Sequence, residues 1–231
     1  MKNVIFAAIA LVVFACAPAS NDNATKADTA TTEAATASSA TTATTAPAPA
    51  EPEEKPMSYY QDKVAEIHTT MGEIDVRFFP DVAPNHVRNF IDLAEKGFYN
   101  GIKFHRVIPG FMIQVGDPNT ISGPRSTWGT GGSEKTVNAE FSTIPHTRGI
   151  LSMARTNDPN SASSQFFIMV HDYPSLNGKY SVFGQVLKGM DVADKIVNLK
   201  TGPGDQPIDP PSIEKIVVRA AKDDEKGPAP K

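Results

Sequence analysis

The residue types that most often carry enzyme chemistry are scattered along this chain. Its five histidines are far apart in the sequence, and no HxH, HExxH or CxxC spacing groups potential metal ligands. A metal site would need side chains to converge in the fold without any local signal. We therefore expect neither a metal ion nor a cofactor in this protein.

Two other chemical motifs are incomplete. The segment GTGGSEK, residues 129–135, resembles a phosphate-binding loop but lacks the GxxxxGK[ST] spacing and a helix-forming run after it. No Gly-x-Ser-x-Gly motif accompanies the serines, so nothing indicates the nucleophile of a serine hydrolase. The pattern at 129–135 is more typical of a glycine-rich surface loop.

Composition excludes further classes of protein. The 231 residues include 22 Lys and Arg against 26 Asp and Glu, which gives no clustered basic surface for wrapping nucleic acid. We therefore expect no nucleic-acid partner. The single cysteine, Cys16, cannot form an internal disulfide, which excludes a small secreted scaffold held by disulfides.

The N-terminus has the features of an export signal. Residues 1–15 carry one lysine ahead of an apolar run, Val4 to Ala15, that is too short to cross a bilayer as a helix. The sequence Val-Phe-Ala-Cys ending at Cys16 resembles the lipobox of bacterial lipoproteins, which implies lipidation of Cys16 and attachment to a membrane. Ala17 then implies the outer membrane, facing the periplasm, in a Gram-negative host. The alternative is an ordinary signal peptide with a cysteine near its cleavage site.

The chain then divides by composition into a tether and one domain. Residues 17–56 contain no Ile, Leu, Val, Met, Phe, Tyr or Trp, so they cannot bury enough surface to repay the entropy of ordering. We interpret residues 16–56 as the lipidated cysteine with a disordered tether, residues 57–222 as a single folded domain, and residues 223–231 as a disordered tail.

The domain must be mainly β. Alternation of Ile74, Val76 and Phe78 predicts a hairpin over residues 64–79, and apolar spacing with Pro84 and Gly97 predicts a helix between them. A second, shorter helix is predicted over 190–199. Short β-like segments separated by turn residues occur at 103–108, 111–116, 149–155, 164–170, 181–187 and 212–220. This order favours an antiparallel barrel or sandwich.

Several of these segments together resemble one family. FHRVIPGFMIQVGD, residues 104–117, is similar to the signature of cyclophilins, the peptidyl-prolyl cis-trans isomerases, and similar matches follow in order at GTGG, NAEF, GILSMAR, SSQFFIMV and LNGKYSVFG. The resemblance covers nearly all of residues 57–221. It implies a closed eight-stranded antiparallel barrel capped by two α-helices, with the substrate groove outside because side chains fill the barrel.

The resemblance also implies the activity and its site. Arg106 matches the catalytic arginine, and Gln114 matches a residue that binds the substrate backbone and steadies that arginine. The remaining matches would bind the prolyl ring and the flanking peptide: Phe111, Met112, Ala154, Arg155, Gln165, Phe167, Leu176 and Tyr180. His105 is expected to be structural, because alternation along a strand points it away from Arg106.

The implied partners are extended or unfolded proline-containing polypeptides, bound by a monomer that assists the folding of exported proteins. The alternative is a binding module that keeps the groove without catalysis. Three positions depart from the family pattern: Ser175 replaces an indole, Tyr180 a histidine and Arg155 an asparagine. Since an indole both packs and donates a hydrogen bond, we expect weak binding of cyclosporin.

Overall fold

The computed structural model of the chain describes residues 55–230. The signal sequence, Cys16 and nearly all of the expected tether lie outside the described residues. The strands are β1 (Lys63–Thr69), β2 (Gly72–Phe78), β3 (Arg106–Ile108), β4 (Met112–Val115), β5 (Ile150–Met153), β6 (Phe166–Met169), β7 (Val182–Lys188) and β8 (Ile213–Ala220). The helices are α1 (Pro84–Glu95), α2 (Asn119–Ser122) and α3 (Met190–Val197). Short 3-10 turns are η1 (Met57–Tyr60), η2 (Arg125–Thr127), η3 (Pro174–Leu176), η4 (Pro203–Asp205) and η5 (Asp223–Glu225).

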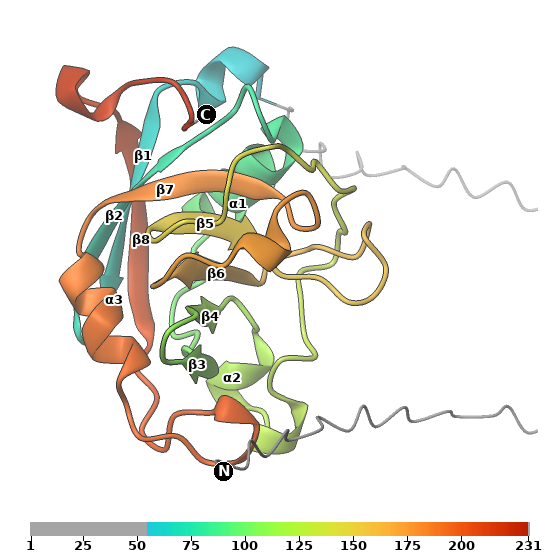
Figure 1. The fold of residues 1–231 in the computed structure, drawn as a ribbon, viewed down its shortest axis with the longest axis vertical. Coiled ribbons are helices and arrows are strands. Elements are labelled where there is room, and N and C mark those ends of the chain that lie inside the picture. Colours follow the sequence, from blue (N-terminus) through green and yellow to red (C-terminus); the bar gives the residue numbers. More distant parts are fainter. Residues whose placement is uncertain (1–54, 231) are drawn as a thin grey trace, which may run out of the picture. The chain divides into compact units, whose positions relative to one another are not determined.

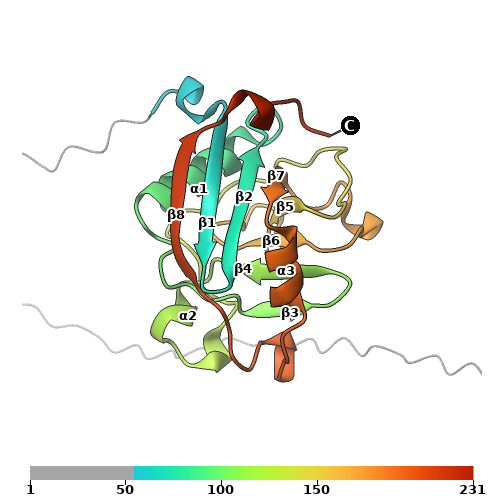
Figure 2. The ribbon, with the colours of Figure 1, turned by 90° about the vertical axis from the view of Figure 1, so that its left-hand side faces the viewer.

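All eight strands belong to one antiparallel sheet in the order β3-β4-β6-β5-β7-β2-β1-β8. The sheet curls round on itself, with β3 and β8 as its edge strands (Figures 1 and 2). The residues ahead of the edge strands make the junction: Lys103 forms an isolated bridge with Ser212, and Gly101 N–H donates to Ile213 O at 2.7 Å. The predicted eight-stranded antiparallel fold is therefore confirmed, but the sheet is a curled half-barrel: β3 and β8 do not pair as strands, and short contacts such as these join its edges instead.

The helix predicted after the hairpin is α1. Its buried stripe contains the expected Val87, Phe90, Ile91 and Ala94, and Gly97 follows it with a left-handed φ of 70°. Helix α1 packs against β7 and β8, whereas α3 packs against β2, β3 and β4, so the two cover different parts of the barrel (Figures 1 and 2). Helix α3 ends at Val197, two residues before the predicted end, and the four-residue α2 was not predicted.

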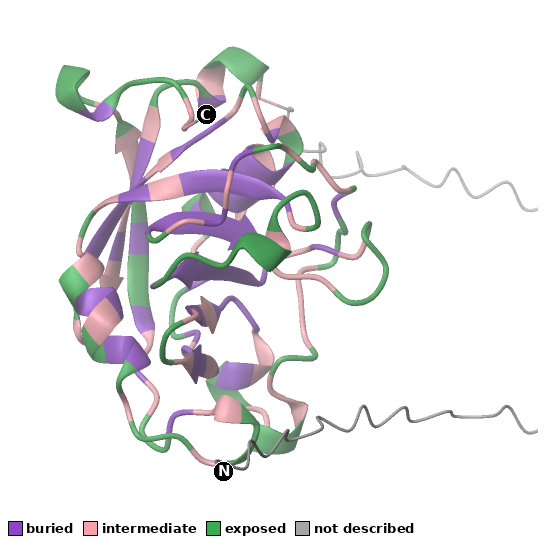
Figure 3. Ribbon diagram, in the orientation of Figure 1, coloured by how far each residue is buried: buried purple, intermediate pink, exposed green. Residues whose placement is uncertain are grey.

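The main hydrophobic core lies inside the curled sheet, and Figure 3 shows that much of β5, β6 and β7 is buried. Aromatic rings from α1 and from facing strands meet there: Phe90 lies 5.1 Å from Phe166 and 5.6 Å from Phe183, measured between ring centroids. All three side chains are fully buried. Because large side chains pack together in the interior, we expect a substrate site on the outer surface.

The first turn of α1 is stabilised from outside the helix. Ala83 precedes the helix and offers no side-chain cap. Instead, the Glu140 carboxylate accepts hydrogen bonds from the backbone N–H groups of Asn85 at 3.1 Å and His86 at 3.0 Å. A carboxylate at this position satisfies otherwise unpaired N–H groups and interacts favourably with the helix dipole. The NAEF segment is thereby attached to α1.

The C-terminal residues correct one expectation. Residues 223–231 were expected to be a disordered tail, but Asp223–Glu225 form η5 and Glu225 is buried. Hydrogen bonds from Arg219, at 2.6 and 2.8 Å, and from the Lys222 backbone lower the pKa of Glu225 to about 2. Charge pairing orders a segment whose composition contains too little apolar surface to predict order.

No helix within residues 55–230 has the length and apolar character needed to span a membrane.

Candidate active site

Successive residues of β6 alternate between two separate apolar clusters. Phe166 and Ile168 belong to the barrel interior, whereas Phe167 and Met169 belong to a second cluster. Because neighbouring side chains of a strand point to opposite faces, the second cluster lies on the outer surface of the sheet. The fold therefore places Phe167 on the face that a ligand can approach, although the residue is only 5% exposed.

This outer cluster gathers the predicted socket residues. Met112 and Phe167 are buried within it, and four further predicted residues pack against it while partly exposed: Phe111, Ala154, Leu176 and Tyr180. The Tyr180 ring meets the Phe167 ring edge-on, with 5.8 Å between centroids. The Phe111 ring lies 4.4 Å from that of Tyr173, which the sequence did not single out. The arrangement is an apolar floor with partly exposed aromatic and aliphatic walls.

Strand register places the polar residues beside this cluster. Arg106 on β3 is opposite Gln114 on β4, and Gln114 is opposite Phe167 on β6. Directly opposed residues project to the same face of a sheet, so these three form a row across the outer surface. Val107, one residue along β3, points into the barrel and anchors the strand there. The row places a guanidinium group near the apolar cluster.

The Arg106 side chain is 42% exposed and points toward a distant part of the chain. Its Nε lies 3.5 Å from Oδ2 of Asp205 in η4. The Arg106 guanidinium does not donate a hydrogen bond to Gln114, the residue expected to steady it; Gln114 Nε2 instead donates to Gln165 Oε1 at 2.9 Å. The two glutamines thus hold each other beside the arginine.

Gln165 also organises the glycine-rich loop. Its Nε2 donates to the carbonyl groups of Gly129 at 3.1 Å and Gly131 at 2.6 Å. Asp117 is fully buried at the other side of the loop, and its carboxylate accepts hydrogen bonds from the Gly129 and Asn119 N–H groups. The side chain expected to bind peptide therefore also shapes the loop that borders the site.

Arg155 is held without a carboxylate partner in the described part of the chain. Its guanidinium lies over the Tyr180 ring at 4.6 Å and donates to the Lys179 carbonyl at 3.1 and 3.0 Å. Ala154 continues the β5–β6 pairing by donating its N–H to Gln165 O at 2.9 Å. These contacts make a rigid edge between the outer cluster and the loop.

Comparison with known protein families shows to which family this chain belongs. Residues 64–218 match the family model described as cyclophilin type peptidyl-prolyl cis-trans isomerase, which includes every predicted site residue of the domain. The chain belongs to the cyclophilin family.

Curated cyclophilin relatives agree over the same region. A probable peptidyl-prolyl cis-trans isomerase of Brucella abortus is 46% identical over 154 residues, covering 64% of this chain and 79% of the relative. A peptidyl-prolyl cis-trans isomerase of Arabidopsis thaliana is 41% identical over 157 residues, covering 67% of this chain and 94% of the relative. These matches confirm the enzyme class expected from the sequence.

Solved structures confirm the fold. A cyclophilin type isomerase of Cryptosporidium parvum superposes with a TM-score of 0.63 at 32% identity, covering 69% of this chain and 99% of that chain. The same protein in the presence of the dipeptide Ala-Pro gives a TM-score of 0.62. A cyclophilin of Hirschia baltica gives 0.57 at 30% identity, covering 68% of this chain and 73% of that chain.

The sequence analysis did not single out His146, a buried histidine next to Phe167 of the outer cluster. The His146 ring lies 6.2 Å from the Phe167 ring, and its Nε2 is 3.1 Å from Ser152 Oγ. Burial lowers the pKa of His146, partly offset by its contact with Asn177. Its partners come from distant segments, so no local motif could have indicated them. His105, by contrast, is buried as expected on the face opposite Arg106, and burial lowers its pKa.

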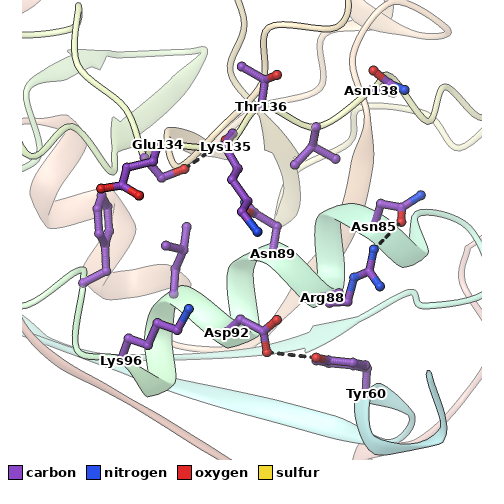
Figure 4. A pocket seen from close by; sticks show the side chains of 14 residues that line it. Tyr60, Asn85, Arg88, Asn89, Asp92, Lys96, Glu134, Lys135, Thr136 and Asn138 are labelled. Atoms are coloured by element: carbon purple, nitrogen blue, oxygen red, sulfur yellow. Dashed lines mark hydrogen bonds between the residues drawn. The ribbon is translucent and has the colours of Figure 1, made fainter. Parts of the chain in front are cut away.

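Two cavities border this part of the molecule. One, of about 490 Å³, lies between the glycine-rich loop and the β5–β6 edge, and is lined by Gln114, Ala154, Arg155 and Gln165 among others. The other, of about 620 Å³, lies between α1 and residues 133–138. Figure 4 shows Arg88 and Asp92 of α1, and Lys96 just after it, facing Glu134 and Lys135 across it. None of the predicted site residues lines the larger cavity.

Proposed function

We propose that this cyclophilin isomerises X-Pro bonds of extended polypeptides at the row formed by Arg106, Gln114 and Phe167. The observation that carries the proposal is the register, which aligns a guanidinium with an apolar cluster on the outer face of the sheet. The prolyl ring would rest on Phe111, Met112, Phe167 and Leu176. A relative of known structure was determined in the presence of Ala-Pro, which supports this class of substrate.

The transition-state stabilisation that this reaction requires is small enough for such a site to supply. Rotation about an X-Pro bond has a barrier of about 18–20 kcal/mol because the amide loses its resonance. Acceleration to about 10 turnovers per second needs roughly 4 kcal/mol of selective transition-state stabilisation. As the amide twists, the prolyl nitrogen becomes pyramidal and gains a lone pair. The Arg106 guanidinium is always charged and acts only as a donor, so it can stabilise that state and not the planar one.

A protease-coupled assay on a cis-proline peptide tests the assignment. Arg106→Ala should lose most of kcat/KM, whereas Arg148→Ala should not, although both arginines are 42% exposed and each pairs with a carboxylate. Equal activity of wild type and Arg106→Ala would overturn the mechanism. Inactivity of the wild type with retained binding of a proline peptide would support the binding-module alternative.

We also propose that the enzyme acts on exported proteins from a membrane attachment at Cys16. The short apolar run and the lipobox-like residues 13–16 support export and lipidation. Metabolic labelling with a fatty acid should mark the wild-type chain and not Cys16→Ser. After cell fractionation, the wild type should sediment with outer membranes, and Cys16→Ser should be soluble in the periplasm. Labelling of both chains would refute lipidation at Cys16.

A further inference from the structure

The side chain of Arg106 has one charged partner among the described residues, and that partner lies outside every cyclophilin motif identified in the sequence. Asp205 Oδ2 approaches Arg106 Nε at 3.5 Å. Gln114 is opposite Arg106 in the sheet, but its amide donates to Gln165. The charge that the structure places beside this long, exposed arginine therefore comes from the η4 loop and not from its cross-strand neighbour.

The backbone of that loop is shaped to present Asp205. Gly204 and Asp205 have left-handed φ values of 73° and 58°. Asp62 is the only other non-glycine residue with a positive φ in residues 55–230. Gly202 N–H donates to Gln206 O at 2.8 Å, and Thr201 bridges Pro207, so a tight turn projects Asp205 at its tip. Such sparsely populated conformations persist where the surrounding structure holds them, and they cluster at functional sites.

Arg125 attaches the turn to the rest of the domain. Its Nη1 donates to Pro207 O and its Nη2 to Ile208 O, both at 2.7 Å, while Gln206 Nε2 donates back to Arg125 O at 3.1 Å. The Trp128 ring packs against the same guanidinium at 4.7 Å. The turn is the loop between α3 and β8, which lies beside η2 and α2 at the bottom of Figure 1.

We propose that Asp205 is a positioning residue for the isomerase reaction: its carboxylate holds the Nε side of the Arg106 guanidinium and leaves the terminal Nη groups free for the prolyl amide. The proposal rests on the proposed role of Arg106. A flexible donor that is already oriented loses less conformational freedom when the twisted amide forms. Asp205 thus acts on the transition state through Arg106 without touching substrate.

Asp205→Asn tests the proposal without disturbing the turn, since asparagine has the same shape and tolerates a left-handed φ. We expect kcat to fall about two- to fivefold, the range for an exposed ion pair, with KM unchanged. The Arg106 Nε–Hε resonance should also shift in an NMR spectrum. Asp62→Asn is the matched control, because it changes the other left-handed aspartate, and it should alter neither quantity.

The same substitution in an Arg106→Ala background separates positioning from structure. If Asp205 acts through Arg106, Asp205→Asn should cause no further loss of kcat there. An equal loss in both backgrounds would overturn the proposal. So would unchanged kcat in Asp205→Asn when Arg106→Ala is strongly impaired. Full activity of Arg106→Ala would instead refute the proposed function itself, and the positioning role with it.

Discussion

Ser175 is exposed and precedes Leu176, which packs against the outer cluster. The family resemblance of the sequence implies an indole at this position in cyclosporin-sensitive proteins. The serine offers neither an aromatic surface nor an indole N–H, so cyclosporin should bind weakly. Ser175→Trp should tighten binding by at least about tenfold, the effect of roughly 1.4 kcal/mol. Isothermal titration calorimetry of wild type, Ser175→Ala and Ser175→Trp measures this. Nanomolar affinity of the wild type would contradict the prediction.

Two phenylalanines with different environments should separate binding from stability. Phe111 is a partly exposed wall of the outer cluster, whereas Phe166 fills the barrel. Phe166→Ala should cost about 3–5 kcal/mol in the free energy of unfolding. Phe111→Ala should cost about 1 kcal/mol or less but lower kcat/KM about tenfold. Urea unfolding measures the stability of both variants, and the protease-coupled assay measures their activity. A larger loss of stability in Phe111→Ala than in Phe166→Ala would contradict the assignment of Phe111 to the outer face and Phe166 to the interior.

At the scale of elements, the start of α1 should make stability depend on pH. Burial raises the pKa of Glu140, but hydrogen bonds from His86 and Asn85 outweigh it, so the net shift is downward from 4.5. The ionised carboxylate therefore contributes stability above about pH 4.5, and that contribution is lost as pH falls through the lower folded value. The loss accompanies protonation of the group that caps the helix.

Glu140→Gln isolates this effect. At pH 7 the wild type should be more stable than the variant by about 1–2 kcal/mol, because the charged acceptor is better at a helix N-terminus. The difference should shrink as pH falls below 4.5 toward 3, measured by urea unfolding at each pH. Glu134→Gln, on an exposed position of the neighbouring loop, is the control. A difference that does not vary with pH would contradict the assignment.

At the scale of the whole molecule, we predict that residues 55–231 suffice for folding and catalysis, because every proposed site residue lies within them. A chain beginning at Lys55 should match the full chain in kcat/KM. A chain beginning at Lys63 should lose stability by about 3–5 kcal/mol, since it lacks Tyr60, which is 1% exposed and donates to Asp92 at 2.9 Å. Thermal unfolding and the isomerase assay compare the three. Loss of activity in the chain from Lys55 would assign a catalytic part to the preceding residues.

Local patterns and family motifs were enough to predict many elements of the fold and the candidate site residues. Alternation along β2 and β6 and the apolar stripe of α1 reflect burial of one face, which is a property of neighbouring residues. Motif matches also predicted Arg106, Gln114 and the socket residues, because these lie within short contiguous segments that resemble the family signature. The outward position of Phe167 follows from the same alternation once Phe166 fills the core.

Contacts between distant segments were decided only by the tertiary structure. Asp205 meets Arg106 and Glu140 caps α1 through approaches that no spacing in the sequence encodes. The same is true of Gln114, whose preference for Gln165 over Arg106 depends on which side chains the curled sheet brings within reach. Apolar patterning specifies which face is buried, but the partner of an individual charge depends on three-dimensional proximity.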